Sequence, residues 1–243
     1  MSPDRTSDLR ARDTSRMTNL WSSPEHVGEY LARADRLPFR ADGERVLVDD
    51  VGTALPGRVL DLGCGDGRLT ALMLASYPDS TAVATDMSPP MLDTARARFT
   101  GDARATVLSY DFRNALPFDE PFDAIVTSLA VHHVEDDRKR TLYAEIAAAL
   151  RPGGVFCNLE IVASPTQVLH DRWRNEMGAH GEPAEHAPHD HGHDAVAARD
   201  DPADRLCALE PQLAWLREVG LIDVDCIWKW RSLALVRGMR PLI

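Results

Sequence analysis

The sequence predicts an α/β protein with a Rossmann-like, doubly wound sheet of seven mostly parallel strands and an antiparallel last strand. Three observations predict this fold class. An apolar run ends in alternate glycines at Gly63, Gly65 and Gly67, and a helical pattern follows at once, as in a strand, a tight turn and a helix N-terminus. Short apolar runs then alternate with helical patterns up to residue 161, which is typical of βαβ units. Two final runs, 222–230 and 233–237, close the sheet as an antiparallel pair.

Length and composition are those of one globular domain. The chain has 243 residues, of which 44% are hydrophobic and 27% charged, enough for a full core. No stretch approaches 18 uninterrupted apolar residues, and the polar segment 1–16 has no apolar centre, so neither a membrane span nor a secretory signal is expected. A net charge of −11 repels a phosphate backbone, which argues against nucleic-acid partners.

The cysteines favour a reducing compartment. Cys64, Cys157, Cys207 and Cys226 are far apart and form no Cys-x-x-Cys motif, so the sequence predicts neither a zinc site nor a disulfide scaffold. Reduced thiols and a cytoplasmic location are therefore expected.

The N-terminal part divides into a leader and a cover. Residues 1–20 are rich in Ser, Thr, Asp and Arg without periodicity and are expected to be disordered. The domain is expected over 21–243, and its segment 21–56 is expected to form a helical cover. Ser23 suits an N-cap and Pro24 the first helical position, and a second helical pattern follows before the first strand.

The glycine turn is suited to a nucleoside. A side chain at Gly63 or Gly65 would block positive φ and hold a cofactor away from the backbone amides. Arg68 stands where a dinucleotide fingerprint needs its third glycine, which disfavours a nicotinamide-dependent oxidoreductase. Asp61 lies two residues before the first glycine, and its carboxylate suits an ammonium group rather than a phosphate. A tight turn without a ligand is the alternative interpretation.

The run Asp61-Leu62-Gly63-Cys64-Gly65-Asp66-Gly67 resembles motif I of the class I S-adenosylmethionine (SAM)-dependent methyltransferases. The resemblance covers roughly residues 58–161 and implies SAM as the cofactor. It also implies methyl transfer to an O, N or C atom of a small molecule, such as a specialised metabolite. Two alternatives stay open: a SAM-consuming enzyme that catalyses cyclisation or cofactor modification, and a non-catalytic SAM-binding partner protein. The expected partner is a small-molecule substrate, and a homodimer is left open.

Acids at two strand ends fit a nucleoside. The strand 81–85 ends at Asp86, where an acid can accept two hydrogen bonds from a ribose diol. The strand 105–109 is followed by Asp111 and Phe112. By resemblance, Asp111 accepts the adenine amino hydrogen and the backbone of Phe112 contacts the ring. A turn or capping role for Asp111 is the alternative.

Further cofactor candidates come from position and from the resemblance. By resemblance, Met87 packs on the adenine face, a role that suits a flexible apolar side chain, with core packing as its alternative. Met91 follows in the next helix. Ser128 and Leu129 lie at a strand end that lines the crevice of a doubly wound sheet, near the sulfonium.

In the resembled family the N-terminal cover touches the methionine end of SAM, which implies roles for Tyr30 and Arg33. An ordinary amphipathic packing face is equally expected. The complete set of cofactor candidates is Tyr30, Arg33, Asp61, Gly63, Cys64, Gly65, Asp86, Met87, Met91, Asp111, Phe112, Ser128 and Leu129.

The candidate catalytic residues also lie at strand ends. His132 and His133 follow the strand 122–128, and histidine is the side chain best tuned to accept a proton near neutrality. Because the two are adjacent, they cannot face the same way, so at most one is expected to be the base. Helix capping or packing on the cofactor is the alternative. Glu160, near the end of the strand 155–161, is a second candidate base, with a structural hydrogen bond as its alternative.

The remaining elements follow from helix signals. A long helix begins at Asp136 and is expected to end at a turn over 151–154. A later helix over 211–219 is stopped by Gly220.

A lid insertion over 163–208 is expected after the fifth strand. A helix is predicted over 165–177, and the Pro-, His- and Asp-rich linker 178–204 is expected to be mobile. Its run His189-x-His191-x-His193 could hold zinc or nickel, but a solvated loop is favoured, and no metal site is expected.

Three tryptophans are candidate substrate residues. Trp173, Trp228 and Trp230 could form an aromatic wall near the lid. Alternation along 227–230 puts Trp228 and Trp230 on one face of the sheet, so core packing is equally expected.

Overall fold

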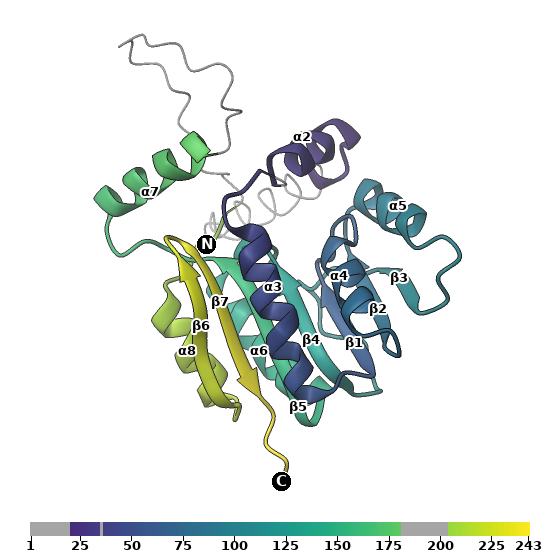
Figure 1. Ribbon diagram of the computed structural model, residues 1–243. Coiled ribbons are helices and arrows are strands. Elements are labelled where there is room, and N and C mark those ends of the chain that lie inside the picture. Colours follow the sequence, from purple (N-terminus) through teal and green to yellow (C-terminus); the bar gives the residue numbers. More distant parts are fainter. Residues whose placement is uncertain (1–19, 35, 181–203) are drawn as a thin grey trace, which may run out of the picture.

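The computed structural model describes residues 20–34, 36–180 and 204–243 (Figure 1). The predicted leader lies almost entirely outside these residues. The His-rich run of the predicted linker lies outside them as well, so its expected mobility stays a prediction.

The centre of the molecule is a seven-stranded sheet with the order β3-β2-β1-β4-β5-β7-β6. Neighbouring strands from β3 to β5 run parallel, and β7 is antiparallel to both β5 and β6. The predicted fold class, including the antiparallel last strand, is confirmed. The strands are β1 (Arg58–Leu62), β2 (Thr81–Asp86), β3 (Ala105–Ser109), β4 (Phe122–Ser128), β5 (Leu150–Ile161), β6 (Ile222–Trp230) and β7 (Leu233–Met239).

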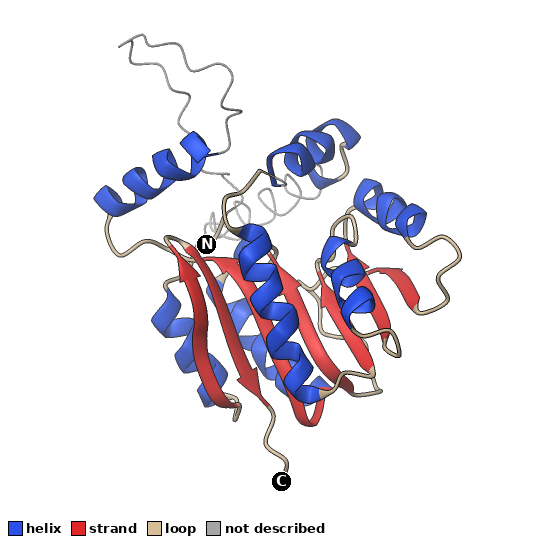
Figure 2. Cartoon of the chain, in the orientation of Figure 1, coloured by secondary structure: helices blue, strands red, loops and turns tan. Residues whose placement is uncertain are grey.

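Helices cover both faces of the sheet (Figure 2). One face carries α3 and α4 and the other carries α6 and α8, while α2 and α7 stand beyond the carboxyl ends of the parallel strands (Figure 1). The helices are α2 (Pro24–Ala34), α3 (Arg40–Val51), α4 (Arg68–Ser76), α5 (Pro89–Arg98), α6 (Asp136–Ala149), α7 (Gln167–His180) and α8 (Leu209–Glu218), with short 3-10 turns η1 (Gly52–Ala54) and η2 (Val131–His133). None of the described helices is both long and apolar enough to span a bilayer.

Two hydrophobic cores lie on opposite faces of the sheet. On the α3 side, Leu47 and Val51 pack in one cluster with Leu159 of β5. On the α6 side, Leu142 and Ile146 pack in the other. A sheet with both faces covered requires strands that are apolar on both sides, as the burial along β1 and β4 shows.

The junction between α6 and β5 differs from its prediction. The strand β5 begins at Leu150, directly after α6, and so starts before the predicted turn over 151–154. Leu150 pairs with Phe122 of β4, and the amide of Gly153 donates to the carbonyl of Arg240 at 2.9 Å. Residues 151–154 form an irregularity within β5, because the pairing with β4 shifts between Leu150 and Val155 and Gly153 has φ +79°.

Candidate functional site

A cavity opens at the carboxyl edge of the sheet, where the strand order reverses between β1 and β4. It encloses about 770 Å³ of empty space, including the part open to solvent, which suits a small-molecule site. Its wall comes from the turns after β1 to β4 and from the N-terminal cover. The predicted cofactor residues that line it are Tyr30, Gly63, Cys64, Gly65, Asp86, Met87, Met91, Asp111, Phe112, Ser128 and Leu129.

The glycine turn after β1 has no room for a side chain at its first position. Gly63 has φ +71°, and a Cβ built on it would stand 2.5 Å from the Cβ of Ala130. The turn is fixed to β2 by two backbone donors: the amide of Cys64 donates to the carbonyl of Thr85 at 2.8 Å, and the amide of Gly65 donates to Asp86 at 2.9 Å. A ligand at this turn would therefore meet backbone rather than side chains.

Asp61 lies beneath the turn, buried, and is not part of the cavity wall. One of its carboxylate oxygens accepts a hydrogen bond from the Thr70 hydroxyl at 2.6 Å, and the other has no hydrogen-bond partner among the described residues. Burial raises the pKa of Asp61 to about 7. An uncompensated carboxylate of this kind would be stabilised by a nearby cation.

Asp86 and Asp111 stand at the ends of β2 and β3. Asp86 accepts from the amides of Gly65 and Ser88, the latter at 2.8 Å, and burial raises the pKa of Asp86. Asp111 pairs with Arg113 at 2.6 Å, and the guanidinium of Arg113 also lies 3.7 Å from the sulfur of Met87. Arg113 therefore lies at the part of the cavity where the resemblance places the adenine.

The N-terminal cover brings Trp21 onto the cavity. Its ring centroid lies 5.0 Å from that of Tyr30 and 5.5 Å from that of His133. Its backbone carbonyl accepts a hydrogen bond from the Ser88 hydroxyl at 2.6 Å. The cover is thus fastened to the residue that caps α5.

A buried glutamate of α3 pairs with two arginines, one at the start of α3 and one at the start of α4. Glu44 is fully buried, and its two oxygens accept from Arg40 and from Arg68, both at 2.8 Å. Arg40 lines the cavity, and no other partner of its guanidinium is found among the described residues. The side chain of Arg33 lies outside what the structure describes, so its predicted role stays a prediction.

The two histidines differ in their access to the cavity, although their ring centroids lie only 4.0 Å apart. His133 lines the cavity, whereas His132 does not. Nδ1 of His132 lies 2.5 Å from Glu160, and the second oxygen of Glu160 accepts from the backbone amide of His132 at 3.0 Å. Although burial opposes it, the negative charge of Glu160 raises the pKa of His132. Of the three candidate bases, only His133 reaches the space where a ligand would lie.

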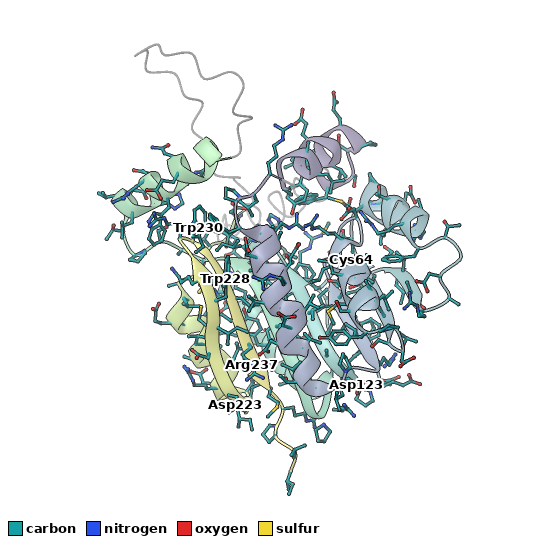
Figure 3. The ribbon with its side chains drawn as sticks, viewed as in Figure 1. Cys64, Asp123, Asp223, Trp228, Trp230 and Arg237 are labelled. Atoms are coloured by element: carbon teal, nitrogen blue, oxygen red, sulfur yellow. The ribbon has the colours of Figure 1, made fainter. Side chains whose placement is uncertain are left out.

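The three predicted substrate tryptophans do not line this cavity. A Cβ on Gly43 of α3 would stand 3.0 Å from the ring of Trp228, and Trp230 packs on Phe39 with a centroid distance of 4.7 Å. Trp173 lies 5.1 Å from the ammonium of Lys229. Figure 3 shows Trp228 and Trp230 on the β6 side of α3, with Cys64 on its other side. The cavity gives no support to a substrate role, and the packing alternative fits these contacts.

Sequence reasoning missed several residues of the cavity wall. Their side chains are placed by tertiary contacts, and only the Arg40/Glu44 spacing of four residues gave a local signal of an ion pair. The missed residues are Trp21, Leu31, Arg40, Asp66, Arg113, Ala130 and Val134.

Residues 59–154 match the family model described as "Methyltransferase domain". A trans-aconitate 2-methyltransferase of Methylobacterium nodulans is 30% identical over 217 residues, which cover 89% of this chain and 76% of the relative. A malonyl-[acyl-carrier protein] O-methyltransferase of Xylella fastidiosa is 33% identical over 46% of this chain and 38% of its own length. The solved structure of human N-acetylserotonin methyltransferase in complex with SAM has a TM-score of 0.64 at 16% identity, over 93% of this chain and 59% of that one.

Proposed function

Since the chain belongs to the class I SAM-dependent methyltransferases, we propose that it transfers the methyl group of SAM to an oxygen atom of a small organic acid. SAM is the cofactor of this family and supplies an electrophilic methyl carbon when it is bound. The task of the protein is to position the reactants and exclude water. The proposal adds the class of acceptor to what membership of the family already implies.

The residues at the cavity fit the cofactor. Beneath the cavity wall, the buried oxygen of Asp61 that has no partner among the described residues suits the ammonium of the methionine end. Arg40, held by Glu44 at the wall, suits its carboxylate. Asp86 suits the ribose diol. Met87, Met91 and Phe112 offer an apolar surface to the adenine.

The observation that carries the acceptor proposal is the part of the cavity wall that is not assigned to SAM. It includes Trp21, Tyr30, Ser128, His133 and Val134, and among these residues His133 contributes the only imidazole. An imidazole can donate a hydrogen bond to a carboxylate, and it can accept the proton of an attacking hydroxyl. A carboxylate acceptor needs no base, because it attacks as an anion.

Two of the matched relatives support an acid, although others are named for quinones. The relative that covers 89% of this chain carries a name that refers to trans-aconitate, and a second carries one that refers to a malonyl group. Both names denote molecules with a free carboxylate. We therefore propose small di- and tricarboxylic acids as the first acceptor class to test.

The test is transfer of isotope-labelled methyl from SAM to a panel of mono-, di- and tricarboxylic acids, read by mass spectrometry. We expect one labelled methyl on a di- or tricarboxylic acid and none with Asp86→Ala, which lacks the predicted ribose contact. SAM binding without transfer to any acid, together with labelling of an amine or a phenol, would overturn the acceptor class. Products that carry the remainder of SAM instead of its methyl would overturn methyl transfer itself.

A further inference from the structure

Three potential metal ligands converge beside the cavity. Nε2 of His132 and Nδ1 of His133 each lie 3.6 Å from the same oxygen of Asp204, and the three groups offer ligand atoms within 4.8 Å of one another. A separation of 3.6 Å is too long for a good hydrogen bond. Two ligands that share an ion through bonds of 2.0–2.2 Å are themselves about 3.0–3.5 Å apart, so small side-chain shifts would bring all three around one ion.

The orientation of His132 is fixed from behind. Glu160 is buried and contacts both Nδ1 and the backbone amide of His132, at 2.5 Å and 3.0 Å. With the proton of the neutral ring held on Nδ1, the lone pair of Nε2 points toward Asp204. Carboxylates hold metal-binding histidines in this manner in many proteins.

Asp204 is also held in place, although it is remote in sequence. The amide of the next residue, Arg205, donates to the carbonyl of His132 at 2.6 Å, and its guanidinium donates to Glu135 at 2.7 Å. The carbonyl of Arg205 accepts a hydrogen bond from the buried ammonium of Lys139. The segment that carries Asp204 is therefore bonded to the turn that carries both histidines.

The charges favour a cation. Glu160 and Asp204 place two carboxylates around His132, and the nearby ammonium of Lys139 is paired with Asp136 at 2.8 Å. Two imidazoles and one carboxylate form a donor set that suits zinc and other divalent first-row transition metals, and three protein ligands leave room for an exogenous ligand.

We propose that His132, His133 and Asp204 bind one divalent transition-metal ion at the rim of the cavity, with Glu160 orienting His132. Because His133 lines the cavity, the open position of the ion would take an oxygen of the acceptor, either a carboxylate or a hydroxyl. Coordination of the acceptor rests on the proposed function, whereas metal binding does not. The sequence predicted no metal site, because Asp204 is separated from the histidines by about 70 residues.

The first experiment is a titration of the full chain with Co²⁺, followed by the visible absorption of the metal and by competition with Zn²⁺. The run His189-x-His191-x-His193 can itself bind metal, so all variants are made in a background with these three histidines replaced by alanine. We expect one equivalent of Co²⁺ in this background. We expect at least tenfold weaker binding in His133→Ala and in Asp204→Asn, and 10- to 100-fold weaker binding in Glu160→Gln.

His170→Ala on α7 is the matched control and should bind Co²⁺ as the background does. Thermal unfolding shows which variants are folded, and His133→Ala and Asp204→Asn keep the buried His132–Glu160 contact intact. The proposal is overturned if the background binds no Co²⁺, or if both of these variants retain one equivalent with unchanged affinity.

A second measurement distinguishes metal binding from coordination of the acceptor by the metal. Addition of trans-aconitate or malonate to the Co²⁺-loaded protein, without SAM, should change the visible spectrum, because an acid that coordinates the ion changes its ligand field. A spectrum that neither acid changes would overturn the acceptor role while the metal site stands. Methyl transfer is assayed independently, so its failure is distinguishable from both.

Discussion

The two halves of the cavity wall are built by different means on one edge of the same sheet. The half formed by β1 and β2 uses backbone amides and glycines, and the link from Gly65 to Asp86 spans 21 residues. The half formed by β4 and β5 uses side chains, with His132 bonded to Glu160 28 residues later and Asp204 farther still along the chain. Substitutions that add side-chain atoms should therefore damage the β1 and β2 half most. Substitutions that remove a bonding partner should damage the β4 and β5 half most.

The largest effect is expected where a buried side-chain partner is removed. Glu160→Ala leaves His132 buried without its carboxylate, which should lower the free energy of unfolding by about 3–5 kcal/mol. Turnover should fall while the SAM affinity of the folded protein changes little. Urea unfolding measures the free energy of unfolding, and calorimetry measures the SAM affinity. Glu218→Ala removes an exposed partner of Arg140 and should cost less than about 1 kcal/mol. An equal loss of turnover and SAM affinity would contradict a role on the acceptor side.

The next largest effect is expected in the half of the cavity wall formed by β1 and β2. Gly63→Ala places a methyl group 2.5 Å from Ala130 in a residue with φ +71°, which should cost about 2–4 kcal/mol of stability and weaken SAM binding more than about tenfold. Gly101→Ala is the matched control, because it has φ +84° and nothing within 4 Å of the new Cβ. It should cost about 1 kcal/mol without affecting SAM binding. If the two variants bind SAM equally well, the close approach at Gly63 has no bearing on the cofactor.

The third effect concerns pH. Burial raises the pKa of Asp61 to about 7, so below pH 7 the carboxyl is mostly protonated and must release its proton to pair with an ammonium. SAM affinity should therefore rise with pH up to about 7, by at most about tenfold per unit, and then level off. In the unliganded protein the sign is opposite: as pH rises from 3.8 to about 7, Asp61 ionises in the unfolded chain but keeps its proton in the folded protein, so stability falls.

Calorimetry of SAM binding at pH 6 in buffers of different ionisation enthalpy would detect the released proton. Asp61→Asn should abolish both the pH dependence and the buffer dependence. Wild-type binding heats that are identical in all buffers would show that Asp61 does not ionise on binding.

The smallest effect is expected at the side chain of Cys64, in the half of the cavity wall formed by β1 and β2. Burial raises the pKa of the Cys64 thiol well above its usual range, so it should be almost unreactive toward iodoacetamide at neutral pH. Cys64→Ala should change SAM affinity less than about threefold, or about 0.7 kcal/mol, because the turn presents amides rather than this side chain. Rapid alkylation that SAM prevents would contradict this expectation.

The same contrast explains what the sequence could predict. The turn Gly63 to Gly67 and the cap at Ser88 are local, and β1 to β4 have their predicted positions because apolar runs and their end signals lie within a few residues. Arg40 and Arg113 reach the cavity through pairs with Glu44 and Asp111, but nothing in the sequence indicated that these helices and turns would point them inward.

The β4 and β5 half was predicted only in part. Adjacency predicted that His132 and His133 cannot face the same way, but nitrogen atoms of both rings lie 3.6 Å from the same oxygen of Asp204. The sequence did not indicate that only His133 lines the cavity. That choice depends on Glu160 and on Asp204, and their positions are set by the register of β5 and by the return of the chain after α7. The early start of β5 at Leu150 was missed for a similar reason, since the partners of Leu150 and Gly153 lie on β4 and near the C-terminus.

The reversed direction of β7 has a practical consequence. Its first residue, Leu233, pairs with Ile161 near Glu160, while its last, Met239, pairs with Val155 toward the opposite edge of the sheet. Figure 1 accordingly places the C-terminus at the far end of the molecule from α2 and α7. A tether or reporter fused after Ile243 would leave the mouth of the cavity unobstructed, which makes this end the natural anchoring point for surface-based binding assays.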